Sequence, residues 1–103
     1  MRYTVRLAIS VILLSAFSGY AIADQATAAK SGCLACHKAD AKLVGPSFKD
    51  IAAKYAGQDG AVDTLAAKVK AGGQGNWGTV PMPASPAPIE DIKTVVAWML
   101  THK

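Results

Sequence analysis

The five-residue stretch from Cys33 to His37 (CLACH) constrains this chain more than any other. Its two cysteines are separated by two residues, so both thiols lie on one face of a single helical turn and can bond the same molecule. The histidine that follows adds an imidazole nitrogen, a frequent ligand of metal ions. This C-x-x-C-H pattern is typical of covalent haem attachment through two thioethers, with the histidine as an iron ligand.

Three other interpretations of the two cysteines are weaker. A thioredoxin-like dithiol requires a βαβ setting, which the sequence does not predict. A structural zinc site requires four ligands, but the chain has two cysteines and two histidines, and His37 directly adjoins Cys36. A disulfide between Cys33 and Cys36 would close a very small loop, stabilise little, and leave His37 unexplained.

The first 23 residues have the pattern of a cleavable secretory signal peptide. Two arginines precede an apolar run from Leu7 to Leu14, and an A-x-A cleavage pattern ends at Ala23. The apolar run is shorter than the roughly 20 residues that a membrane-spanning helix needs. We expect cleavage after Ala23, a periplasmic domain of residues 24–103 and no stable membrane insertion; an uncleaved anchor is the alternative.

The composition of residues 24–103 limits the classes of partner and the size of the core. Nine lysines stand against seven acidic residues, and no basic stripe with interleaved aromatics indicates nucleic-acid binding. A domain of this size buries a modest core and usually needs a disulfide, a metal or a cofactor to stabilise it. A covalently bound haem would supply that apolar surface. We expect a monomer, since no pattern indicates an oligomeric interface.

Apolar residues at helical spacing predict an all-α domain with four short helices and no strand. An alanine-rich helix follows Asp24, and a second helix follows the S-x-x-D cap that begins at Ser47. Asp59 is the expected cap of the third helix, which ends before Gly72. These helices are expected at residues 25–30, 48–55, 60–71 and 89–100, with an irregular loop over 72–88.

A haem iron held by His37 has a second axial position. Met99 lies on the apolar stripe of the last helix, so we expect it in the core, and His102 lies near the C-terminus, where we expect solvent. Met82 stands between two prolines, off any helix, on a loop that both prolines stiffen. Met82 is therefore the favoured ligand, although a methionine that fills a gap in the core is the alternative.

Three further residues are candidates for the surroundings of the haem. The carbonyl of Pro46 can accept the second N–H of His37 and fix its ring, or Gly45-Pro46 is an ordinary turn. Trp77 can pack on the haem and donate its indole N–H to a propionate, or it belongs to the core. Lys68 can pair with a propionate, or it is a solvated lysine.

Taken together, these motifs resemble the small periplasmic class I cytochromes c of denitrifying and ammonia-oxidising proteobacteria. Proteins of that family are short monohaem electron donors to nitrite reductase and related terminal enzymes. The resemblance covers essentially all of residues 24–103, and the combination with the W-G-x-V-P-M-P stretch is more specific than the haem motif alone. Its segments are Cys33–His37, Leu43–Pro46, Ile51–Tyr55, Gln74–Gly78, Val80–Pro83 and Ala97–Trp98.

The resemblance implies a role for each candidate residue. It implies one haem c, bound through Cys33 and Cys36, with His37 and Met82 as axial ligands. It also implies that the Pro46 carbonyl orients His37, that Trp77 bonds a propionate, and that Lys68 stands where the family often has arginine. Where the family commonly has an asparagine that bonds the ligand sulfur, this chain has Ser85.

These features predict a compact class I cytochrome c fold and a one-electron carrier, not an enzyme. Histidine–methionine ligation favours Fe(II) and raises the reduction potential. The partners implied are transient redox proteins, such as a nitrite reductase, a terminal oxidase, a peroxidase or a quinol-oxidising cytochrome complex. The alternative is a haem protein with a labile sixth ligand that acts as a gas sensor or a weak peroxidase.

Overall fold

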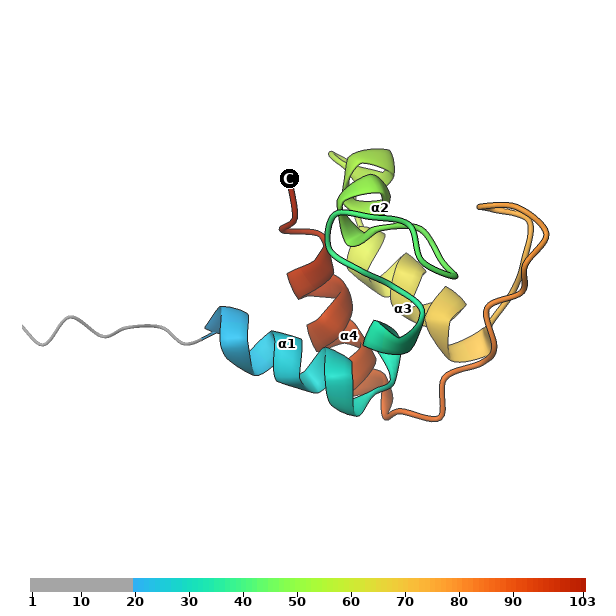
Figure 1. Ribbon diagram of the computed structural model, residues 1–103. Coiled ribbons are helices and arrows are strands. Elements are labelled where there is room, and N and C mark those ends of the chain that lie inside the picture. Colours follow the sequence, from blue (N-terminus) through green and yellow to red (C-terminus); the bar gives the residue numbers. More distant parts are fainter. Residues whose placement is uncertain (1–19) are drawn as a thin grey trace, which may run out of the picture.

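Four short α-helices form the fold of residues 20–103, the part of the chain that the computed structural model describes. They are α1 (Tyr20–Lys30), α2 (Phe48–Tyr55), α3 (Ala61–Ala71) and α4 (Ile89–Met99), and a short 3₁₀ helix, η1 (Cys33–Ala35), follows α1 (Figure 1). The only β-pairing within these residues is one isolated antiparallel bridge between Gly73 and Met82. The all-α prediction is therefore confirmed.

Helix α4 packs against each of the other three helices. Its buried residues are those of the predicted apolar stripe, Ile92, Val95, Val96 and Met99, whereas Ile89 at its start is exposed. From the facing helices, α2 contributes Phe48, Ile51 and Tyr55 to the core and α3 contributes Leu65 and Ala66. Burial of Met99 confirms that it is a core residue.

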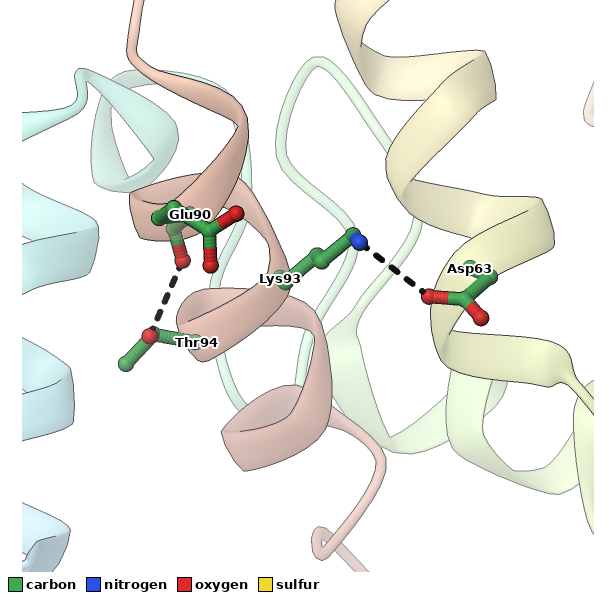
Figure 2. A network of polar contacts seen from close by, with 4 residues as sticks. All are labelled: Asp63, Glu90, Lys93 and Thr94. Carbon is green, nitrogen blue, oxygen red and sulfur yellow. Dashed lines mark hydrogen bonds and ion pairs between the residues drawn. The ribbon is translucent and has the colours of Figure 1, made fainter.

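Two polar contacts on α3 and α4 lie outside this apolar core (Figure 2). The Lys93 ammonium lies 3.5 Å from a carboxylate oxygen of Asp63, and the Thr94 hydroxyl donates to the Glu90 carbonyl at 3.0 Å. The Lys93 side chain is 42% exposed and that of Asp63 is 78% exposed, so water screens their ion pair and it contributes little stability. Apolar packing therefore holds these two helices together.

Two of the three predicted helix caps are wrong. Asp24 lies inside α1, which already begins at Tyr20. Gly60 precedes α3 with a φ of 70°, and no side chain caps that helix. Glycine reaches this left-handed conformation without steric cost, so the chain turns into α3 at Gly60 instead of at Asp59.

The cap at Ser47 is confirmed. Its hydroxyl accepts a hydrogen bond from the Asp50 backbone N–H at 3.0 Å, and the residue is 2% exposed. We expect Ser47→Ala to lower the free energy of unfolding by about 1 kcal/mol, because α2 loses its cap, whereas Ser47→Gly costs only a few tenths of that. Urea denaturation of the haem-loaded variants checks this order, and equal losses would contradict the capping role.

The predicted signal peptide, residues 1–23, lies mostly outside the described residues. Within residues 20–103, no helix is long and apolar enough to cross a membrane.

Candidate cofactor site

The two cysteines lie on one turn of the chain: Cys33 begins η1 and Cys36 directly follows it. Gly32, with a φ of 77°, leads into this turn in a conformation that favours glycine. The backbone N–H groups of Cys36 and His37 both donate to the Cys33 carbonyl, at 3.3 and 3.0 Å. The two thiols are unpaired and half-buried, and both line the same cavity.

Cys33 lacks the electrostatic signature of a reactive dithiol. Burial raises the pKa of its thiol above the usual value, and a hydrogen bond from the residue's own backbone to the sulfur offsets this only in part. Reactive redox cysteines instead have lowered pKa values, because the thiolate is the nucleophile. The raised pKa at Cys33 is the opposite of the shift that such a nucleophile shows.

The Pro46 carbonyl fixes the ring of His37, as the sequence predicts. Nδ1 of His37 lies 2.7 Å from that carbonyl oxygen, so Nδ1 carries the donated hydrogen and Nε2 remains for a ligand. The Phe48 ring stacks on the His37 ring, with the two centroids 5.7 Å apart and an angle of 20° between the ring planes. The orientation of the imidazole therefore depends on the loop and on the core.

Gly45 leaves room for the His37 ring. A Cβ atom on Gly45 would overlap with Cε1 of that ring, closer than real contacts allow. We expect Gly45→Ala to displace the ring from Pro46 and to cost about 1–3 kcal/mol of stability, as overpacking does elsewhere.

Urea denaturation of the haem-loaded protein tests this expectation. Gly73→Ala is the comparison, because a Cβ atom there meets no protein atom within 4 Å. Equal losses of stability in the two variants would contradict a steric conflict between Gly45 and His37 as the cause.

Met82 lies on the loop that joins α3 and α4, and its backbone is held in place. Its N–H donates to the Gly73 carbonyl at 2.7 Å, and its carbonyl accepts from the Gly73 N–H at 3.0 Å. Gly72 follows the last residue of α3 and has a φ of 71°. It lies so close to the loop that a Cβ atom on it would be 2.7 Å from the Met82 carbonyl oxygen. The end of α3 thus positions Met82. This residue is 37% exposed.

Ser85 stays close to α3 and α4. Its N–H donates to the Val69 carbonyl at 3.1 Å, and its hydroxyl accepts from the Ala87 N–H at 3.3 Å. The hydroxyl hydrogen remains available to a further acceptor.

One cavity of about 490 Å³ brings the predicted residues together. Its volume lies in the range of roughly 300–1,000 Å³ that cofactor and small-molecule sites occupy. Apolar side chains from α2, α3, α4 and the loop form much of the wall. All seven candidate site residues line it: Cys33, Cys36, His37, Pro46, Lys68, Trp77 and Met82.

Trp77 and Lys68 lie at the exposed part of this wall. Trp77 is 43% exposed, so the alternative that it belongs to the core is wrong. The Lys68 side chain is exposed, and its ammonium lies 5.6 Å from the centroid of the Tyr55 ring. Both side chains can therefore meet a bound group and water at once.

The prediction that His102 is solvated is wrong. Its ring is half-buried and lies 4.7 Å from Trp98 and 5.5 Å from Phe48, measured between centroids. Its Nδ1 lies 2.9 Å from the Met99 carbonyl, because the turn after α4 folds the residue back over the core.

Comparison with known proteins identifies the family. Residues 22–103 match the family model described as cytochrome c. The chain belongs to the cytochrome c family. It is 62% identical over 72 residues to cytochrome c-551 of Azotobacter vinelandii, an alignment that covers 70% of this chain and 88% of that relative.

Relatives from Nitrosomonas europaea match in both sequence and structure. Cytochrome c-552 of Nitrosomonas europaea is 48% identical over 87 residues, which is 84% of each chain. The crystal structure of the wild-type Nitrosomonas europaea cytochrome c552 superposes with a TM-score of 0.74 at 46% identity, covering 77% of this chain and 99% of that one. The predicted class I cytochrome c fold is thereby confirmed, and the chain is a haem c electron carrier rather than an enzyme.

The residues that this cytochrome c places around the cavity fit a covalently bound haem. Two unpaired thiols lie on one turn of the wall, and the adjoining imidazole has one nitrogen committed to Pro46 and the other available. A mostly apolar cavity wall suits a macrocycle that is itself mostly apolar. The donor set thus matches the C-x-x-C-H chemistry.

Some residues that shape the site had no separate signal in the sequence. Gly45 was identifiable only as part of a turn, and its contact with His37 arises from the fold. Phe48 was identifiable as a core residue but not as the ring that stacks on His37. Lys54 contacts the loop 22 positions away, a separation at which no periodicity relates two residues.

Proposed function

We propose that this cytochrome c is an exported, periplasmic one-electron carrier with one haem, bound through Cys33 and Cys36 and ligated by His37 and Met82. The observation that carries the proposal is the convergence of these four residues on one apolar cavity. When bound, haem c supplies an Fe(II)/Fe(III) couple whose potential depends on the axial ligands.

The protein residues would set that potential and the rigidity of the site. The Pro46 carbonyl holds His37 in one tautomer, which would leave Nε2 free to bind the haem iron. The paired backbone of Met82 and Gly73 presents the thioether with little conformational freedom. A ligand set held in this way changes little between the two oxidation states, which favours fast electron transfer.

Transient redox proteins are the proposed partners. Val44 and Val80 line the cavity and are 54% and 65% exposed, so apolar surface lies at its mouth. A small apolar patch of this kind suits brief docking better than a permanent complex. A nitrite reductase, a terminal oxidase, a peroxidase or a quinol-oxidising cytochrome complex is the class of partner that the family resemblance implies.

Mass spectrometry and voltammetry of the protein from a periplasmic extract test this proposal together. We expect the mass of residues 24–103 plus one haem, and one reversible one-electron wave. A haem-free chain or the absence of a reversible wave would overturn the carrier. A mass that includes residues 1–23 would overturn only the proposed cleavage after Ala23.

A further inference from the structure

Lys54 joins α2 to the loop that carries Trp77 and Met82. Its ammonium donates to the Asn76 carbonyl at 3.1 Å and lies 4.5 Å from the centroid of the Trp77 ring. One charged group therefore binds two consecutive residues of the loop, once through a hydrogen bond and once through a cation–π contact.

Lys54 itself does not line the cavity. Asn76 and Trp77 are part of the cavity wall, and Lys54 contacts both of them from α2, outside the cavity. Lys68 differs, because it lines the cavity and can meet a bound group directly. Any effect of Lys54 on the bound group must consequently pass through the loop or through its charge.

The segment that Lys54 contacts is otherwise held by short-range bonds of the loop. Figure 1 shows the chain between α3 and α4 running out from the helices before it returns. The bonds between Gly73 and Met82 close its base, and the Gly75 N–H donates to the Gly78 carbonyl at 2.8 Å across its tip. Lys54 adds a contact from α2, whose core residues Ile51 and Tyr55 hold the helix in place.

We propose that Lys54 is a positioning residue that holds Trp77 at the mouth of the haem cavity and raises the reduction potential. The inference rests on the proposed function, because it requires a bound haem. The ammonium restrains the indole in the cavity wall, and its positive charge favours Fe(II), the oxidation state with one positive charge fewer.

The test compares haem-loaded Lys54→Met, Lys54→Arg and Lys49→Met with the parent protein. Lys49→Met is the matched control, since Lys49 lies exposed on the same helix but lines a groove with Leu100 and Lys103 instead. The measurements are the hydrogen-exchange rate of the Trp77 indole N–H by NMR and the reduction potential by voltammetry.

We expect Lys54→Met to speed the indole exchange by about tenfold, as loss of a cation–π contact and a hydrogen bond together predicts. It should also lower the reduction potential more than Lys49→Met does. Lys54→Arg should restore both values, because arginine keeps the charge, the donors and the cation–π contact.

Unchanged exchange in Lys54→Met, equal shifts in potential for Lys54→Met and Lys49→Met, or no rescue by arginine would each overturn the inference. The visible spectrum of each variant separates this failure from that of the proposed function. A parent protein without His/Met-ligated haem contradicts the function, whereas a normal parent spectrum with unaltered Lys54 variants contradicts only the role of Lys54.

Discussion

Replacing Met82 by alanine is expected to lower the reduction potential by on the order of a few hundred millivolts, within the roughly 0.8 V that haem axial ligands span. The thioether sulfur is a soft ligand that favours Fe(II), and alanine offers no donor in its place. The Met82 backbone is tied to Gly73, so the loop is not free to supply another ligand from a neighbouring residue. Voltammetry and the visible spectrum of the haem-loaded variant measure the change.

Met99→Leu is the control for this substitution. Met99 is buried on α4 as part of the core, and leucine has a similar volume. We expect its spectrum to match that of the parent protein. If Met82→Ala keeps the parent spectrum and potential, or if Met99→Leu loses them, the assignment of the axial methionine is wrong.

The second large effect is expected when Cys33 and Cys36 are both replaced by serine. Serine hydroxyls form no thioether with the haem vinyl groups, so haem staining after denaturing electrophoresis should disappear. The yield of folded protein should also fall, because the remaining core is modest for a domain of this size.

Single substitutions refine this test. Cys33→Ser and Cys36→Ser each leave one thiol on the turn, so each variant should retain stained haem with lower stability than the parent. Haem that stays bound to the double variant through denaturation would show that these cysteines are not the attachment site.

The helices were predictable because their signals are local. Phe48, Ile51 and Tyr55 follow helical spacing after the Ser47 cap, and the structure buries all three. The cap at Asp59 was mispredicted because Gly60, which lies between Asp59 and α3, takes the left-handed conformation and begins the helix without a side-chain cap. His102 was mispredicted because the turn after α4 brings it back to Trp98, which a position near the C-terminus does not reveal.

Candidate ligands could be proposed from the sequence because these donors are rare residue types in distinctive settings. Two cysteines, one adjoining histidine and one methionine between prolines indicate the ligands without any geometry. Some of the contacts that orient these residues could not be predicted from the sequence. The clash that forbids a side chain at Gly45 and the link from Lys54 to Trp77 join distant segments, and they exist only once the helices have packed.

The oxidised visible spectrum of the parent protein, followed by carbon monoxide addition to the reduced form, tests the central claim most directly. Ligation by His37 and Met82 predicts low-spin iron, a sulfur-to-iron charge-transfer band, and slow or no binding of carbon monoxide. High-spin iron that binds carbon monoxide rapidly would contradict the carrier and indicate a gas-binding protein with an open sixth position.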